Sequence, residues 1–196
     1  MRRIKDRETG ATMSVHAAAL RNFLSALNRA NGVGPVRAHQ PPRPEDPRPR
    51  REAAAHILGV NVTRRRILLV AEPSSALHDH IGWLDRHTRG VRLCDTLHDA
   101  EDIAGPSPDD WMTLVSLDHG ISLNTTLDRL GAHRQKIPGR VIIVASRMFA
   151  HHNMSCDHAA IADASLRLPA TRAELALCLS AALTNNTQAL RRAQLG

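Results

Sequence analysis

From Arg66 onward, short apolar runs alternate with segments of helical periodicity, and this alternation limits the fold more than any other feature of the sequence. The apolar runs span residues 67–70, 91–95, 111–118, 140–146 and 164–168. Runs of this length, bounded by turn residues, are typical of buried strands. The intervening segments predict helices over 74–90, 96–105, 121–133, 147–161 and 171–186. Five strands alternating with five helices predict a parallel sheet that is covered by helices on both faces.

Polar residues follow or end three of these predicted strands. Glu72 follows the first strand, Asp118 ends the third and Ser146 ends the fourth. Doubly wound sheets place their sites at the carboxyl ends of the strands, near the point where the strand order switches. The three side chains are therefore predicted to converge at one rim of the sheet.

The same strand ends resemble those of a bacterial receiver domain, the domain that defines response regulators. ILLVAEP resembles the first-strand motif, LVSLD the third strand, RVIIVAS the fourth and LRLP the end of the fifth. The resemblance runs from about Arg66 to Leu183. It implies an α/β fold with a doubly wound, five-stranded parallel sheet of the flavodoxin-like type. It also implies that Asp118 is the candidate phosphoacceptor and Ser146 the candidate switch hydroxyl.

The sequence departs from the receiver pattern at the residues that carry its chemistry. Receivers end the first strand with two acidic residues that help to hold Mg²⁺, and here these positions are Ala71 and Glu72. The family's lysine position is Leu168, and the neighbouring Arg167 is expected to point to the opposite face of the strand. Glu72 and Asp118 are the two carboxylates left for a metal. We therefore expect a degenerate pseudo-receiver without a cofactor, or with Mg²⁺ if the pocket still works.

Three functions remain open on these residues. The first is a non-catalytic pseudo-receiver that binds proteins in bacterial signal transduction, with a histidine kinase or another regulatory protein as partner. The second is a single-domain response regulator that is phosphorylated on Asp118. The third is a scaffold or accessory subunit of a larger assembly. An enzyme is not expected, because the sequence shows no nucleophile elbow, GxGxxG or P-loop motif.

The N-terminal third differs from the rest in charge and in pattern. Residues 1–66 carry 14 Lys and Arg against 5 Asp and Glu, and residues 67–196 carry 12 against 14. Segment 14–31 has helical periodicity, and a Pro- and Arg-rich stretch follows it. The apolar stripe of this helix is the predicted surface for a protein partner or for a second copy of the chain; it comprises Val15, Leu20, Phe23, Leu24 and Leu27.

The predicted organisation is an N-terminal extension (1–32), a disordered linker with a short helix (33–63), the receiver-like domain (64–185) and a C-terminal tail (186–196). Translation starts at Met1 or at Met13. No run approaches the 18 apolar residues of a membrane span, no secretory signal is evident, and three cysteines without paired spacing fit a reducing cytoplasm. Aromatic residues make up 2% of the chain, so nucleic-acid contact is expected to be non-specific and confined to the basic third.

The predicted fourth helix also contains a cluster of metal-binding residue types. HHNMSCDH, residues 151–158, combines histidine, cysteine and aspartate, which can bind Zn²⁺ or copper. Its spacing matches no established four-ligand pattern. We therefore expect a polar segment rather than a metal site, on a face formed by the fourth helix, fifth strand and fifth helix that receivers use for partners.

Overall fold

The structure of the protein is a computed structural model that describes residues 60–105, 110–118, 123–155 and 161–195. The predicted partner helix 14–31, with Val15, Leu20, Phe23, Leu24 and Leu27, and the linker that follows it lie outside these residues. Both therefore stay predictions. Within the described residues, no helix is long and apolar enough to cross a membrane.

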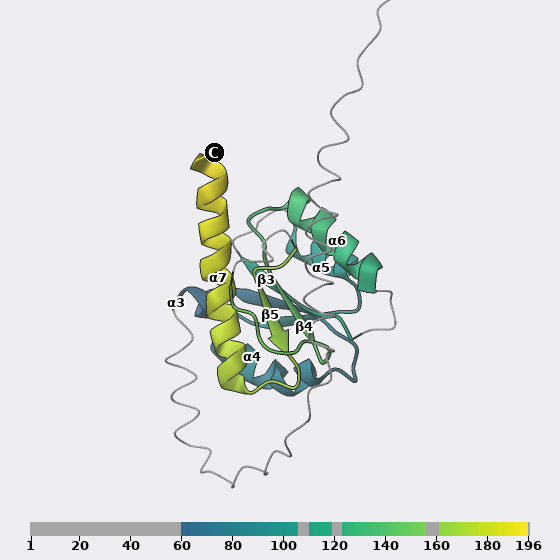
Figure 1. The fold of residues 1–196 in the computed structure, drawn as a ribbon. Helices are drawn as coiled ribbons and strands as arrows, with labels where there is room; N and C mark the ends of the chain where they lie inside the picture. Colours follow the sequence, from purple (N-terminus) through teal and green to yellow (C-terminus); the bar gives the residue numbers. More distant parts are fainter. Residues whose placement is uncertain (1–59, 106–109, 119–122, 156–160, 196) are drawn as a thin grey trace, which may run out of the picture.

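Five strands form a single parallel sheet, and they confirm the predicted fold class (Figure 1). Their order across the sheet is β2-β1-β3-β4-β5. This is the strand order of flavodoxin-like doubly wound folds, in which the order switches between the first and third strands. The strands are β1 (Arg66–Val70), β2 (Val91–Cys94), β3 (Trp111–Ser116), β4 (Val141–Ser146) and β5 (Ala164–Arg167).

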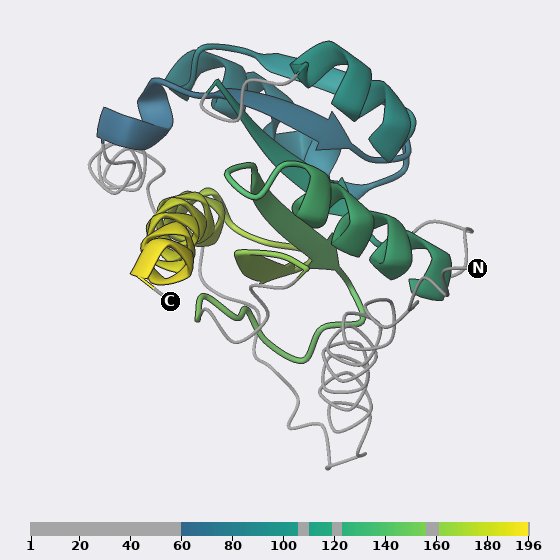
Figure 2. The ribbon, with the colours of Figure 1, turned by 90° about the horizontal axis from the view of Figure 1, so that it is seen from above.

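Helices cover both faces of the sheet. One core cluster joins the sheet to α3, α4 and α7, and the other joins it to α5 and α6. Figure 2 shows α6 and α7 on opposite sides of the sheet. The described helices are α3 (Val60–Thr63), the 3-10 helix η1 (Ala76–His80), α4 (Ile81–His87), α5 (Leu97–Ala104), α6 (Leu123–Lys136) and α7 (Arg172–Leu195).

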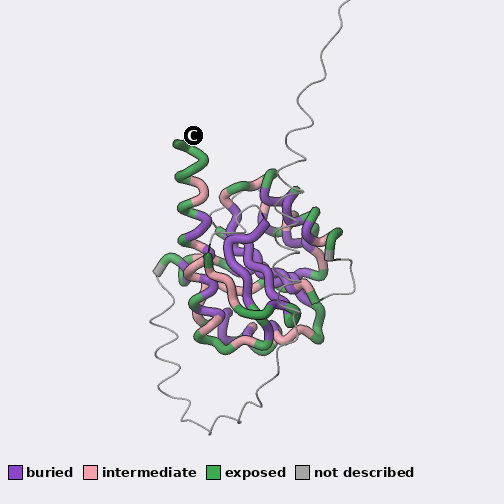
Figure 3. Tube along the Cα trace, in the orientation of Figure 1, coloured by how far each residue is buried: buried purple, intermediate pink, exposed green. Residues whose placement is uncertain are grey.

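The inner strands are buried because both of their faces are apolar. In β1, Ile67 and Leu69 face the α4 and α7 side, whereas Leu68 and Val70 face the α5 and α6 side. All four side chains are buried, as are all residues of β3 and β4 (Figure 3). Continuous apolar runs of this kind are the signature of parallel strands that are covered twice.

Capping residues fix the starts of two helices where the sequence placed them. Thr96 accepts a hydrogen bond from the N–H of Asp99, and the Asp99 carboxylate accepts one from the N–H of Thr96. Thr171 and Glu174 repeat this capping box at the start of α7. Each box satisfies helix N–H groups that have no partner within the helix.

The prediction of a fourth helix over 147–161 is wrong for its described part. Residues 147–155 form no helix, and Asn153 instead makes an isolated antiparallel bridge to Ser165 of β5. The Asn153 side-chain oxygen accepts hydrogen bonds from the N–H and the hydroxyl of Ser155, at 2.9 and 2.7 Å. Local bonds of this type compete with helix formation. The partner face that was predicted to include this helix is therefore built from an irregular segment.

Two other helices differ from expectation in extent. The first predicted helix is divided into η1 and α4, with Ser75 capping η1. Helix α7 continues to Leu195, through residues that the sequence suggested as a tail. Its last turns project past the sheet (Figure 1).

A buried polar network ties the amino ends of β4 and β5 to two helices. Asp163, which is fully buried, lies 2.6 Å from the Arg134 guanidinium of α6 and accepts the N–H of Ile142 at 2.7 Å. Two asparagines of α7 donate to Asp163 as well. The Asn185 side-chain amide donates to the Asp163 carbonyl oxygen at 2.8 Å, and the Asn186 amide donates to its carboxylate at 3.3 Å. Burial raises the pKa of Asp163, and Arg134 acts against that rise.

Candidate functional site at the carboxyl edge of the sheet

The strand register brings the predicted site residues to one edge. Val70 pairs with Val115, Val115 pairs with Val144, and Ser116 pairs with Ala145. Ala71 and Glu72 therefore leave β1 beside the point where Leu117 and Asp118 leave β3, and Ser146 is the last residue of β4. The switch in strand order lies between β1 and β3 at this same edge, as predicted.

Asp118 and Ser146 contact each other directly. The buried Ser146 hydroxyl donates to Oδ1 of Asp118 at 2.5 Å. The N–H of Arg147 lies 3.0 Å from both carboxylate oxygens, and the N–H of Met148 donates to the Ser146 hydroxyl at 3.0 Å. The Asp118 carboxylate is thus a hydrogen-bonded acceptor that fastens the turn after β4 to the end of β3.

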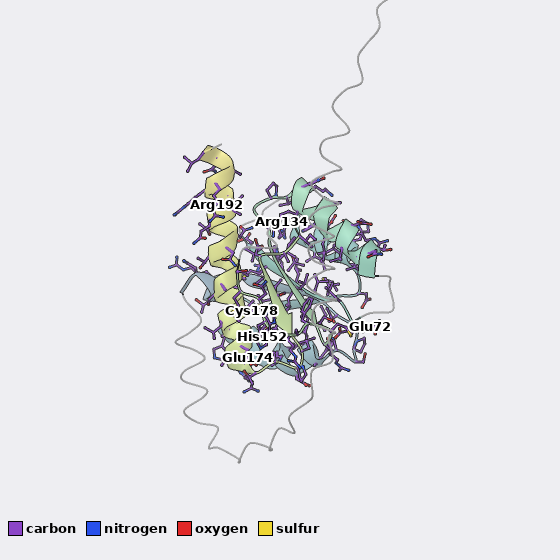
Figure 4. All side chains as sticks on the ribbon, in the orientation of Figure 1. Glu72, Arg134, His152, Glu174, Cys178 and Arg192 are labelled. Atoms are coloured by element: carbon purple, nitrogen blue, oxygen red, sulfur yellow. The ribbon has the colours of Figure 1, made fainter. Side chains whose placement is uncertain are left out.

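Glu72 lies at the exposed end of β1. The structure places it at the same edge as Asp118 through the strand register, and its side chain is exposed. Nearby, the Ser75 and Ser116 hydroxyls lie 3.4 Å apart and link the start of η1 to the end of β3. Figure 4 shows Glu72 well away from His152 and Glu174, which lie on the β5 and α7 side.

The position that carries a lysine in receivers is part of the apolar core. Leu168 has 2% of its surface exposed and belongs to the cluster that packs against α4 and α7. Arg167 is exposed, as the alternation of strand side chains predicted, and its guanidinium donates to the carbonyl oxygen of Ala150 at 2.8 Å. Neither side chain therefore brings a cation to Asp118.

The residues at this edge fit a magnesium site poorly. Mg²⁺ prefers near-octahedral oxygen ligands and usually needs one or two carboxylates that remain open to it. Ala71 offers no side-chain ligand, and both oxygens of Asp118 already accept hydrogen bonds. Within the described ranges, no group of three or more histidine, cysteine, aspartate or glutamate side chains is placed to hold a metal ion. Cys156, Asp157 and His158 of the histidine-rich segment lie outside those ranges.

His152 connects the irregular segment to β5 and α7. Its Nδ1 accepts a hydrogen bond from the N–H of Arg167 at 3.1 Å, and its Nε2 lies 3.1 Å from the Glu174 carboxylate (Figure 4). An imidazole that accepts at Nδ1 carries its proton on Nε2, which is the atom facing the carboxylate. His152 thus links the irregular segment to β5 and α7.

Two further histidines are buried on opposite sides of the molecule. His80, in η1, has 6% of its surface exposed, and His133, near the end of α6, has 3%. Nδ1 of His133 lies 2.7 Å from the Glu101 carboxylate. Burial lowers the pKa of both imidazoles. A backbone hydrogen bond at Ala170 acts against the decrease for His80, and the Glu101 carboxylate acts against it for His133.

The two cysteines among the described residues are free and buried. Burial raises the pKa of the Cys178 thiol to about 12 and that of Cys94 to about 11. Both side chains are therefore protonated at neutral pH and serve as core residues, not as thiolate nucleophiles.

The sequence missed two parts of this site. The backbone N–H of Arg147 donates to the Asp118 carboxylate, yet any residue other than proline could supply this N–H. The amino-acid sequence therefore gives no sign of it. The pairing of Ser75 with Ser116 was missed for a related reason, because serine is common at both helix starts and strand ends.

Comparisons with known proteins show no family for this chain. The chain matches no protein-family model and no curated protein. Among solved structures, it is similar to a crystal structure of a response regulator protein from Burkholderia pseudomallei with a phosphorylated aspartic acid, calcium ion and citrate. The identity is 19%, the match covers 67% of this chain and 74% of that chain, and the TM-score is 0.46. The fold assignment accordingly rests on the strand order and register described above.

Proposed function

We propose that the domain is a pseudo-receiver that acts as a non-catalytic protein-binding module in bacterial signal transduction. The proposal is supported by the strand order, by the position of Asp118 and Ser146 at its switch point, and by the altered residues around them. The partner is a regulatory protein, either a histidine kinase or another component of the same signalling route.

The observation that carries this proposal is the state of the Asp118 carboxylate. Phosphoryl transfer to a carboxylate needs a free oxygen nucleophile and cations that offset the charge developing on the phosphoryl group. Here the Ser146 hydroxyl and the Arg147 N–H bond to the carboxylate, and the position of the lysine in receivers holds the buried, apolar Leu168. These contacts favour a structural role for Asp118 over a phosphoacceptor role. The set formed by Asp118, the Ser146 hydroxyl and the Arg147 N–H is called the latch below.

A binding role also fits the surface around the latch. Met148, two residues after Ser146, has 62% of its surface exposed. The irregular segment after β4 is anchored at two points. The Arg167 guanidinium donates to the carbonyl oxygen of Ala150, and His152 contacts the N–H of Arg167 and the Glu174 carboxylate. An irregular but well-anchored segment presents a defined surface to a partner without requiring a chemical switch. In this proposal, the predicted helix 14–31 is a second contact.

The second candidate is a response regulator that is phosphorylated on Asp118. One observation favours it, since Asp118 is exposed and the Ser146 hydroxyl reaches its carboxylate from the position of the switch hydroxyl in receivers. In that case the hydrogen bonds of Ser146 and Arg147 would have to open before phosphoryl transfer.

Binding of a phosphoryl analogue separates the two candidates. The full-length protein is titrated with Mg²⁺ and beryllofluoride while the backbone amide signals of Arg147 and Met148 are followed by NMR. We expect no change in either signal, because neither Leu168 nor Arg167 brings a cation to Asp118 that would hold the analogue. The control is Asp118→Asn, which cannot form the acyl-phosphate analogue. Amide shifts that appear in the wild-type protein and vanish in this variant would establish the response-regulator candidate instead.

A further inference from the structure

Arginine side chains gather at the amino edge of the sheet, opposite the candidate site. Arg64 and Arg66 flank the start of β1, Arg89 precedes β2, and Arg92 lies within β2; all four are exposed. The N–H of Arg89 donates to the carbonyl oxygen of Arg65 at 2.8 Å, and Arg92 pairs in register with Leu68. Four exposed residues are thus held on two adjacent strands and their entry turns, and together they form the arginine surface.

Two of these side chains share a face of the sheet. Leu68 and Val70 of β1 and Cys94 of β2 belong to the core cluster on the α5 and α6 side. Because strand side chains alternate, Arg66 and Arg92 project on that same side. The exposed apolar residue Leu93 points to the other side of β2. Leu93 therefore does not lie on the face that Arg66 and Arg92 share.

Arg66 is held in a fixed orientation by an aromatic ring. Its guanidinium carbon lies 5.3 Å from the centroid of the buried Trp111 ring. A guanidinium that packs on an aromatic face keeps its N–H edge free for an anion, and its planar fork matches two oxygens of a phosphate. The ring also lowers the entropy that the arginine side chain would lose on binding.

Among the described residues, no carboxylate forms an ion pair with this surface. The exposed Asp85, Asp95 and Asp110 are not ion-paired with Arg64, Arg66, Arg89 or Arg92 within residues 60–105 and 110–118. The basic N-terminal third, with 14 Lys and Arg against 5 Asp and Glu in residues 1–66, joins the domain at this point. Arg64 and Arg66 belong to that basic segment, and Arg89 and Arg92 extend the positive charge to β2.

We propose that the arginine surface binds the phosphodiester backbone of double-stranded nucleic acid without reading its base sequence. Arginine forks suit phosphate oxygens, and contacts of this kind act through charge alone. A single strand is a poorer fit, because the binding of unpaired bases relies on exposed aromatic rings. Trp111 is buried and its face is taken by Arg66. This role is independent of the function proposed for the Asp118 edge.

The test measures how binding depends on salt. Full-length protein is titrated against a fluorescently labelled DNA duplex of arbitrary sequence at several salt concentrations. Each phosphate contact contributes about −0.9 to the slope of log K against log salt concentration. We expect the double variant Arg66→Gln/Arg89→Gln to make the slope shallower by about two. The matched control is Arg129→Gln/Arg172→Gln, which removes two exposed arginines from α6 and α7 and should leave the slope unchanged.

Further arms identify the ligand and guard against misfolding. The variant Arg66→Lys/Arg89→Lys keeps both charges and should restore the slope, which separates lost contacts from lost structure. Equal slopes for the Gln variant and its control would overturn the proposal. So would tighter binding to phosphatidylserine vesicles or to polyglutamate than to the duplex, since the surface would then recognise a lipid headgroup or negative charge in general.

Discussion

The two edges of the sheet differ in where their charge lies. At the carboxyl edge, where flavodoxin-like folds carry their sites, Asp118 and Glu72 are exposed and Leu168 is buried in the core. At the amino edge, Asp163 and Arg134 form a buried pair inside a network with Asn185 and Asn186. The carboxyl edge thus carries exposed carboxylates, whereas the opposite edge holds a buried ion pair.

This difference separates a functional role from a structural one. A buried ion pair is tolerated only when hydrogen bonds satisfy the remaining polar atoms, as Ile142 and Asn186 do for Asp163. An exposed carboxylate exchanges its partners for water at little cost. Changes to the buried pair at the amino edge should therefore affect folding, whereas changes to exposed residues such as Asp118 should affect what the surface binds.

The sharpest test of the comparison is to break the buried pair. Replacing Arg134 with Met should lower the free energy of unfolding by about 3–5 kcal/mol, because Asp163 would keep a buried charge without its partner. Urea denaturation followed by circular dichroism measures the loss. The exposed Arg129 of the same helix gives the control, and Arg129→Met should change stability by less than about 0.5 kcal/mol. A loss below about 1 kcal/mol for Arg134→Met would show that the amino edge is not the stabilising one.

Acid should weaken both edges through their buried histidines. The pKa of His80 and of His133 is lowered in the folded protein, so the unfolded chain, with a histidine pKa of about 6.5, binds more protons below that pH. Stability is then fully present above pH 6.5 and is lost as the pH falls below it, by up to about 1.4 kcal/mol per pH unit for each histidine. The loss of stability due to each histidine ends once the pH falls below the pKa of that histidine in the folded protein.

Single variants assign this pH dependence to an edge. His80→Asn removes the histidine at the carboxyl side and His133→Asn the one at the amino side, and each should flatten the stability profile between pH 6.5 and 5.5. Denaturant midpoints measured across this range give the slope. A wild-type slope that neither variant changes would mean that other groups cause the acid sensitivity.

The smallest effect is expected at the Asp118 latch. Asp118→Ala removes the acceptor of the Ser146 and Arg147 bonds and should cost about 1 kcal/mol, since water can replace it at an exposed site. Asp118→Asn keeps one acceptor oxygen and should cost less. Thermal denaturation of both variants provides the measurement. A loss as large as that of Arg134→Met would make the latch a structural element and would remove the contrast between the edges.

The sequence predicted the layers of the fold but not its irregular parts. The apolar runs and the caps at Thr96 and Thr171 are local signals, and the structure has strands and helices where they indicated. Residues 147–155 were predicted as helix because βα units repeat, yet Asn153 bonds to Ser155 and bridges to Ser165. That outcome depends on a long-range contact with β5, which no window of the sequence contains.

The candidate site was predictable to the same limited degree. Asp118 and Ser146 were assigned to one rim from their strand-end positions, and their side chains do meet. The participation of the Arg147 N–H depends on the turn after β4, and backbone geometry of this kind has no residue signature. The Arg134–Asp163 pair was missed because an arginine and an aspartate 29 residues apart look like two surface charges until the fold buries them.

The bridge between Asn153 and Ser165 makes the two edge strands of the sheet, β5 and β2, differ in how far their backbone groups are already paired. Unpaired strand edges are templates on which other chains can add a strand and aggregate. Along β5, the bridge occupies both the N–H and the carbonyl oxygen of Ser165, so an incoming strand finds no continuous row of free groups there. The border formed by β2 is protected differently, by its length of four residues and by the charge of Arg92. Any self-association of this domain through strand addition should therefore begin at β2.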